Sequence, residues 1–257
     1  MQRSRDFHPL TLLTQALFVI ASSSALVAGP VEADSSSSDD LLAKSIAVHD
    51  PLGLWQDGVF RLHLEETRPD GPSRKTTLLI DNSTGRFEIA TQRDGSQIDG
   101  VLEGDGCELR LDGSTEFTEE EREKYRLTCE RLEWLRNYYV YLWGLPMKLL
   151  DSGTALDPDV LDTTYQDRSV QALRVSYEPE VGSDIWYFYL DTETHAVAGY
   201  RFFHDEAQGD GEYITLDGMI EAGGLRLPKA RAWYTNAEDR YLGTDTLVSL
   251  EILSNGD

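Results

Sequence analysis

The sequence predicts a mainly β fold of the α+β class, in which a strongly curved antiparallel sheet wraps around a helix. Three observations support this prediction. Apolar and polar residues alternate along most of the chain after residue 58, turn-forming residues separate the alternating stretches at short intervals, and one long segment with helical periodicity interrupts them. Sequential strands joined by short turns form antiparallel sheets, and an inserted helix then has to cover one face.

The first 33 residues have the pattern of a secretory signal peptide. Arg3 and Arg5 precede an apolar stretch without acidic side chains, and Val31-Glu32-Ala33 fits a signal-peptidase site. We expect cleavage near Ala33 and a periplasmic or secreted product. The alternative is a retained anchor, but the most apolar part, Leu10–Ile20, is too short to span about 30 Å of hydrocarbon at about 1.5 Å per residue. We therefore expect no stable membrane anchor.

The chain is strongly acidic, which limits its partners. It contains 46 Asp and Glu against 23 Lys and Arg, for a formal net charge of −23, and the signal segment contributes equal numbers of each sign. Such a surface repels phosphate backbones and the sequence shows no basic stripe, so we expect no nucleic-acid partner. A cationic partner is an alternative, although a well-solvated surface explains the charge more simply.

Residues 34–40 are expected to form a flexible leader, and residues 41–257 a single domain. A chain of this length can bury one core, and we expect a monomer. Asp39 or Asp40 can cap a short N-terminal helix. His49-Asp50-Pro51 should end that helix, because a residue before proline avoids helical backbone angles.

Most of the remaining chain is predicted to form strands. From Val59 the side chains alternate, with Phe60, Leu62 and Leu64 on one face, as a half-solvated strand requires. Asn82-Ser83-Thr84-Gly85 has the composition of a hairpin turn, in which glycine supplies a positive φ angle. The expected strands are 59–65, 76–81, 86–92, a hairpin at 97–112 and, after a loop at 151–158, 162–167, 171–178, 184–190, 196–203, 212–220, 225–235 and 242–253.

The segment 118–150 is predicted to be a helical insertion. Thr118 and Glu121 have the spacing of a capping box. Apolar residues then recur at steps of three and four as far as Leu142, which places them on one helix face. The second half, Trp134–Trp143, is aromatic on several sides. A helix this apolar must be enclosed or must cover something apolar, so we expect it to form a lid.

The two cysteines, Cys107 and Cys129, both lie beyond the signal segment. In an oxidising compartment an even pair predicts one disulfide, which here would join the helix to the sheet. Closing a loop of this size contributes about 3 kcal/mol in the chain-entropy model. The alternative is a pair of buried thiols.

The order of these elements resembles the LolA/LolB-like class of periplasmic lipoprotein carriers. The resemblance rests on the hairpin Tyr189–Thr194, on Gly199–Phe202, and on Gly224–Lys229 leading to Trp233-Tyr234. Tyr138–Lys148 also resembles a hallmark of an uncharacterised exported bacterial family associated with that fold. Proteins of this class bind acyl chains or lipoproteins in an apolar cavity. The resemblance thus implies an antiparallel half-barrel sheet with a helical lid, and an apolar ligand or a lipoprotein as partner.

Motifs for catalysis or for metal binding are not evident in the sequence. It has no Gly-x-Ser-x-Gly elbow or Walker loop, and no two of its five histidines have helical ligand spacing. A calcium site among His204, Asp205, Glu206, Asp210 and Glu212 is an alternative to a solvated hairpin loop. We therefore expect neither metal nor cofactor, and an enzyme is the less favoured interpretation.

The leading hypothesis is an exported binding protein that holds a lipid, acyl chain or lipoprotein segment between sheet and lid. Two alternatives stay open: an exported enzyme with a scattered polar site, and an interaction scaffold with a filled core. Tyr and Trp side chains gathered around a helix favour the rim of a cavity over a dry core. The residues expected to line the apolar cavity are Phe60, Leu62, Leu64, Phe87, Ile89, Trp134, Tyr138, Tyr139, Leu142, Trp143, Trp186 and Phe188.

Overall fold

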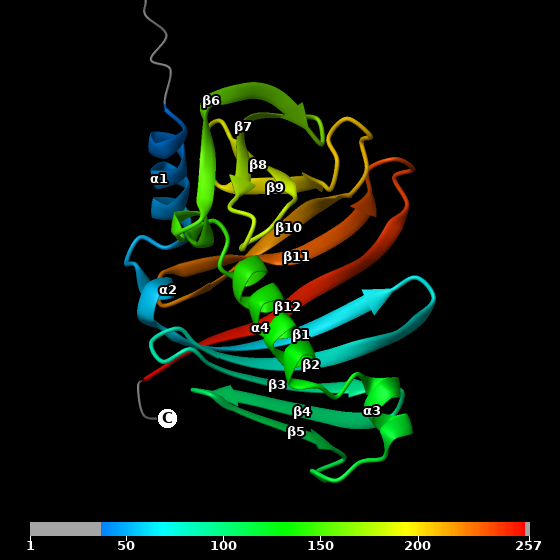
Figure 1. Ribbon diagram of the computed structural model, residues 1–257. Coiled ribbons are helices and arrows are strands. Elements are labelled where there is room, and N and C mark those ends of the chain that lie inside the picture. Colours follow the sequence, from blue (N-terminus) through cyan, green and yellow to red (C-terminus); the bar gives the residue numbers. More distant parts are fainter. Residues whose placement is uncertain (1–36, 255–257) are drawn as a thin grey trace, which may run out of the picture. The chain divides into compact units, whose positions relative to one another are not determined.

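The computed structural model describes residues 37–254, so the expected signal segment at 1–33 lies outside the described residues. The described residues form one compact unit. Its described part contains a single 12-stranded sheet and several helices (Figure 1). The strands are β1 Val59–Arg68, β2 Gly71–Asp81, β3 Arg86–Arg93, β4 Ser96–Glu103, β5 Gly106–Leu111, β6 Thr154–Tyr165, β7 Arg168–Tyr177, β8 Ile185–Asp191, β9 Val197–Phe203, β10 Glu212–Ala222, β11 Leu225–Thr235 and β12 Tyr241–Leu253. The helices are α1 Ser38–His49, α2 Leu54–Asp57, α3 Glu119–Tyr125, α4 Cys129–Trp143 and a 3₁₀ turn, η1 Met147–Leu150.

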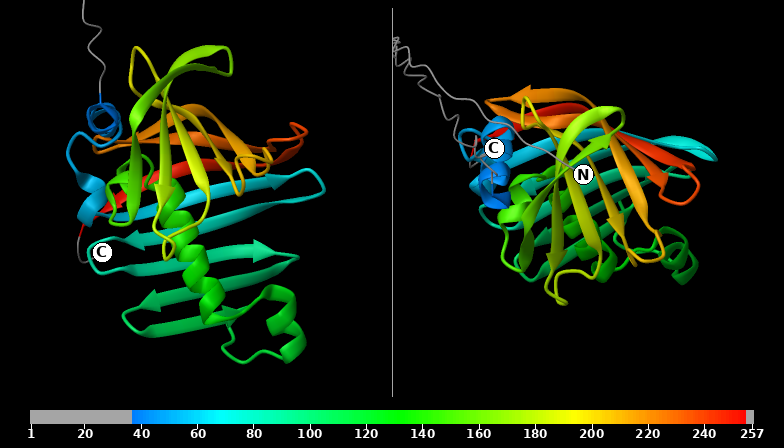
Figure 2. Two further views of the ribbon diagram at one scale, coloured as in Figure 1. Left: turned by 45° about the horizontal axis from the view of Figure 1, so that its top comes forward. Right: turned by 90° about the horizontal axis from the view of Figure 1, so that it is seen from above.

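The sheet joins two halves of the chain. Strands β1 to β5 are neighbours in chain order, β6 to β12 likewise, and β1 pairs with β12 between the halves. Within residues 37–254 the edge strands β5 and β6 do not pair with each other, so the sheet curves without closing (Figure 2). Helix α4 crosses its hollow face (Figure 1). The predicted curved antiparallel half-barrel with a helical lid is confirmed.

The N-terminal helix begins earlier than predicted. Ser37, not Asp39 or Asp40, is its cap, because the Ser37 side chain accepts a hydrogen bond from the backbone N–H of Asp40 at 3.2 Å. Ser38–Asp40 therefore belong to α1 and not to a flexible leader. The helix ends at His49, as predicted.

His49 fastens α1 to the sheet. Its Nδ1 donates to the carbonyl of Arg226 at 2.9 Å, and its Nε2 accepts from the N–H of Val197 at 3.1 Å. Burial lowers the pKa of this imidazole, and the positive charges of Arg231 and Arg226 lower it further. The neutral ring satisfies both contacts, so the helix is held by an uncharged hydrogen-bond bridge.

The helical insertion at 118–150 is not one helix. The predicted capping box is present, with Thr118 accepting from Glu121 N and Glu121 accepting from Thr118 N. The chain then breaks at Arg126, which has a left-handed φ of 56°. Thr128 caps a second helix, α4, by accepting from Arg131 N at 3.2 Å. The prediction of a single helix is wrong. The left-handed backbone at Arg126 ends α3, and the cap at Thr128 begins α4.

Strand β6 begins inside the loop expected at 151–158. Thr154 already pairs with Tyr177, and the register shifts between Leu156 and Val160. Pro158 lies within that irregularity. Because β6 is an edge strand, a residue without an N–H is tolerated there, and the proline marks a bulge instead of a loop.

Helix α4 packs into two apolar clusters at once. Leu132, Tyr139 and Trp143 lie in a cluster built on β1 to β4, β11 and β12. Leu142 lies in a second cluster, built on β7 to β11 and α1. Tyr138 packs against both clusters. The helix is therefore the common wall of two cores, and displacing it would expose both.

A buried arginine holds the C-terminal end of α4. Arg231 of β11 is 1% exposed, and its guanidinium lies 3.7 Å from the ring centroid of Trp143. It donates to the carbonyl of Leu142 at 3.0 Å and to the hydroxyl of Tyr200 at 2.7 Å. A helix C-terminus carries partial negative charge, so the end of α4 acts as a partner for this cation.

The N-terminal end of α4 is held covalently. Cys107 and Cys129 form the predicted disulfide, with Cα atoms 6.0 Å apart and a sequence separation of 22. Cys129 is the first residue of α4. The bond therefore fixes the start of α4 to the edge strand β5.

Replacing both cysteines by serine should lower the free energy of unfolding by about 3 kcal/mol, because the unfolded chain regains the freedom of the closed loop. Urea denaturation of the oxidised chain and of C107S/C129S measures the difference. Reductant should reproduce the loss in the wild-type chain and have no effect on the double variant. Equal stability of the two proteins would show that the bond does not constrain the fold.

Candidate functional site

Two cavities border α4. The helix lies over the concave face of the sheet, with one cavity on each side of it. Trp134 and Tyr138 line both cavities. The two rings stack on each other, with centroids 5.1 Å apart and planes 12° from parallel. Residues four apart lie one above the other on a helix, so the spacing of the two aromatics produces this stack.

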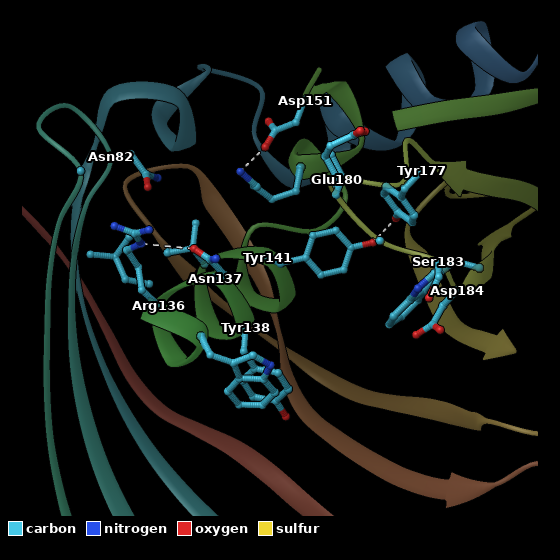
Figure 3. A pocket seen from close by; sticks show the side chains of 18 of the residues that line it. Asn82, Arg136, Asn137, Tyr138, Tyr141, Asp151, Tyr177, Glu180, Ser183 and Asp184 are labelled. Carbon is cyan, nitrogen blue, oxygen red and sulfur yellow. Dashed lines mark hydrogen bonds and ion pairs between the residues drawn. The ribbon is translucent and has the colours of Figure 1, made fainter. Parts of the chain in front are cut away.

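The large cavity, about 680 Å³, lies between α4, the β2–β3 turn and the β7–β8 loop (Figure 3). Its lining combines aromatic side chains with polar and charged ones. Figure 3 shows Tyr141 of α4 and Tyr177 of β7 pointing toward each other, and their hydroxyls form a hydrogen bond. The lining residues are Ile80, Asp81, Asn82, Gly85, Arg86, Trp134, Arg136, Asn137, Tyr138, Val140, Tyr141, Lys148, Asp151, Tyr177, Glu180, Val181, Gly182, Ser183, Asp184 and Trp186.

The tyrosines of the large cavity are neutral. Burial raises the pKa of Tyr138 and of Tyr141 well above the usual value, and it raises the pKa of Tyr177 to about 12. Trp186 meets Tyr141 edge to face, with ring centroids 5.7 Å apart. The wall therefore offers aromatic surface and uncharged hydroxyls, which suit an apolar ligand.

Several charged groups at the rim have partners in ion pairs or in turns. Lys148 forms an ion pair with Asp151. Asp81 accepts from the backbone of Ser83 at 2.9 Å and from the hydroxyl of Thr84 at 2.7 Å, which fixes the predicted hairpin turn. The ammonium group of Lys148 thus has a carboxylate partner, and its position fits the rim of a cavity.

The small cavity, about 240 Å³, lies between the α3–α4 segment and strands β1 to β5. Its floor is apolar, and arginines surround it. The lining residues are Glu66, Arg68, Arg74, Ile89, Thr91, Arg93, Ile98, Gly100, Leu109, Tyr125, Arg126, Leu127, Thr128, Arg131, Leu132, Trp134, Leu135, Tyr138 and Tyr139.

Glu66 anchors the middle of α4 at the small cavity. The residue is 2% exposed. Arg74 donates to both carboxylate oxygens, at 2.8 and 2.6 Å, and the hydroxyls of Thr76 and Tyr139 donate at 2.5 and 3.0 Å. Burial alone would raise the pKa of Glu66, but these bonds and the charge of Arg74 outweigh it and hold the pKa below its usual value.

The Glu66→Gln variant should lose about 2 kcal/mol of stability at pH 7, because the bonds to a charged acceptor are stronger than those to an amide. A lowered pKa in the folded state means that this stabilisation is present above the ordinary value of 4.5 and is lost as pH falls through the lower folded value. Urea denaturation at pH 7 and pH 3 should show the gap between wild type and variant narrowing. Glu251→Gln, an exposed ion-pair partner of Arg61, is the control and should stay within about 1 kcal/mol.

The structure divides the predicted cavity residues into two groups. Ile89, Trp134, Tyr138, Tyr139 and Trp186 line one cavity or both. The other seven are packed inside the core clusters and line neither cavity, because α4 sits directly on the sheet beneath it. These seven are Phe60, Leu62, Leu64, Phe87, Leu142, Trp143 and Phe188.

The prediction missed the far wall of the large cavity. Tyr177 and the loop 180–184 complete that wall. Glu178–Gly182 forms a turn, with the N–H groups of Val181 and Gly182 donating to the carbonyl of Glu178 at 2.8 and 3.1 Å. Val181 is 57% exposed in this turn. The apolar residue Val181 next to Gly182 in a turn is the sequence feature that could have indicated this wall.

In the acidic loop considered for calcium, Asp210 and Glu206 form hydrogen bonds or ion pairs with other groups of the protein. Asp210 accepts from the N–H of Asp205 at 2.8 Å, and Glu206 pairs with Arg174 at 2.5 Å. His204 contacts Asp184 at 2.8 Å. Across residues 37–254, no group of three or more His, Cys, Asp or Glu side chains is arranged to hold a metal ion. In the same part of the chain, no helix has the length and apolarity required to cross a membrane.

Comparison with known families identifies the family of the chain. Residues 17–250 match a family of unknown function (DUF6503). The chain belongs to this family. The match covers nearly all of the described residues of this DUF6503 chain, and both cavities lie within it. No curated protein matches the chain.

A solved structure with a TM-score of 0.50 shows the fold class of this DUF6503 chain. A LolA superfamily protein from Nitrosomonas europaea is 9% identical with a TM-score of 0.50, over 85% of this chain and 94% of that one. A putative outer membrane lipoprotein-sorting protein domain from Vibrio parahaemolyticus is 10% identical with a TM-score of 0.49, over 85% and 93%. The resemblance to the LolA-like fold and to an uncharacterised family is confirmed.

Proposed function

We propose that this DUF6503 chain is an exported binding protein that holds a lipid or acyl chain in the large cavity beside α4. The observation that carries the proposal is the cavity of about 680 Å³, which is walled by Trp134, Tyr138, Tyr141, Tyr177 and Trp186. Ligand pockets typically measure about 300–1,000 Å³ and combine an apolar wall with a few polar groups. This cavity has both properties.

The exposure of Trp134 supports a ligand at this place. Its side chain is 51% exposed although it belongs to the most aromatic segment of the chain. Covering apolar surface stabilises a complex by about 25 cal/mol per Å² removed from water. A chain lying along the Trp134–Tyr138 stack would cover that ring without moving α4.

Export is part of the proposal. The N-terminal segment has the pattern of a signal peptide. The disulfide between Cys107 and Cys129 fits an oxidising compartment, because disulfides rarely persist in a reducing cytoplasm. We accordingly propose a periplasmic or secreted, monomeric protein whose residues 41–257 form one domain, with the helical insertion 118–150 bordering the ligand. The fold shared with a LolA superfamily protein supports the apolar class of ligand.

The full chain purified from cells that export it should carry a lipid or acyl compound, detected by native mass spectrometry and identified after organic extraction. Trp134→Ala should weaken binding of a single-chain alcohol such as 1-decanol by about tenfold in calorimetry, because one aromatic wall is lost. Leu161→Ala removes an apolar side chain that is 47% exposed on β6, outside both cavities, and should change nothing. Protein that is free of lipid and does not bind 1-decanol would refute the proposal.

A further inference from the structure

The lining of the small cavity is mainly basic, whereas the protein as a whole is acidic. The whole chain has twice as many acidic as basic residues, 46 against 23. The lining of the small cavity has five arginines and one carboxylate, that of Glu66. These arginines come from β1, β2, β3, the α3–α4 connection and α4. A fold with a net charge of −23 thus concentrates positive charge at one place beside the helix.

Two of the five arginines are neutralised by carboxylates. Arg74 holds Glu66 through two hydrogen bonds, with the shorter at 2.6 Å. Arg68 lies 3.1 Å from Asp245, which is itself 4% exposed. In each pair the negative carboxylate offsets the positive guanidinium. The two pairs therefore contribute little net positive charge to the cavity.

The other three arginines have no strong partner. Arg93 is 3.9 Å from the carboxylate of its neighbour Asp94, beyond hydrogen-bond distance. Within residues 37–254, Arg126 and Arg131 form no salt bridge with an acidic side chain. Arg126 and Arg131 are therefore left without a carboxylate partner among the described residues, and Arg93 has only a distant one.

Arg131 is the most constrained of the three. It is half-buried in the first turn of α4, and its guanidinium lies 4.0 Å from the ring centroid of Trp134. Burial lowers the pKa of Arg131, and repulsion by Arg126 lowers it further. A cation near the positive end of a helix dipole, next to other cations, is unfavourable unless an anion binds there.

The remaining lining is apolar. Ile89, Leu132 and Leu109 contribute to the floor. Gly100 lets the helix approach β4, because a Cβ atom there would lie 2.7 Å from a methyl group of Leu132. A volume of about 240 Å³ falls below the usual range for a complete ligand but can hold a head group with a short length of chain.

We propose that this arginine cavity is an anion subsite that binds the phosphate or carboxylate head group of an amphiphile whose apolar chain lies in the large cavity. The inference rests on the proposed function, since it assigns the polar end of the same ligand. The Trp134–Tyr138 stack borders both cavities, so one molecule can lie along it. Arg126 and Arg131 bind the anion, and the stack of Arg131 on Trp134 aligns the guanidinium.

Three probes of different composition test the subsite by calorimetry on the full chain: decyl phosphate, 1-decanol and inorganic phosphate. Decyl phosphate should bind at least about tenfold tighter than 1-decanol, and the gain should shrink at high salt. The double variant R126Q/R131Q should remove this gain and leave binding of 1-decanol unchanged. R131K, which keeps the charge but loses the stacked guanidinium, should retain part of it. R240Q changes an arginine outside both cavities and should have no effect.

The outcomes separate the two proposals. If 1-decanol binds but decyl phosphate binds no tighter, or if R126Q/R131Q keeps the preference, the anion subsite is wrong and the proposed function stands. If inorganic phosphate binds as tightly as decyl phosphate, the arginines serve a free anion and not an amphiphile. If neither decyl compound binds, both proposals fail. Circular dichroism shows whether each variant is folded. If the double variant unfolds, the salt dependence of decyl phosphate binding to the wild-type protein still tests the subsite.

Discussion

A buried guanidinium that has no carboxylate partner among residues 37–254 keeps α4 on the sheet. Arg231 lies beneath the C-terminal end of the helix, where it contacts the ring of Trp143 and donates to the carbonyl of Leu142. Its third contact is the hydroxyl of Tyr200 on β9. Taking an arginine out of water is costly unless such partners are present. The end of α4 provides one of these hydrogen-bond acceptors. A shift of α4 would leave the buried charge of Arg231 without it, and this constraint fixes the position of the helix.

The cavities follow from fixing α4 at three points. The disulfide holds its first residue, Glu66 holds Tyr139 in its middle, and Arg231 holds its end. A helix fixed in this way cannot collapse into the space beside it, so Trp134 and Tyr138 are left with cavities on both sides. In the proposed function, the neutral aromatic wall is the apolar subsite and the arginines are the anion-binding subsite, both along a single helix.

Local patterns predicted the fold well because neighbouring strands in the sheet are mostly neighbours in sequence. Alternation and turn residues are visible over a few positions, whereas the pairing of β1 with β12 joins the two halves of the chain and leaves no local trace. The site was harder to predict. Period-two spacing marked Phe60 as inward-facing, but it could not show that α4 would fill the space above it. The arginines of the small cavity come from five places in the chain, so their proximity exists only after folding.

Intermolecular nuclear Overhauser effects between a ¹³C-labelled decyl chain and the protein test the central claim most directly, because they locate the ligand without a mutation. The account predicts contacts from the chain to the ring protons of Trp134 and Tyr141, which face the large cavity. Contacts confined to the outer face of the sheet, for example to Val248 of β12, would contradict it.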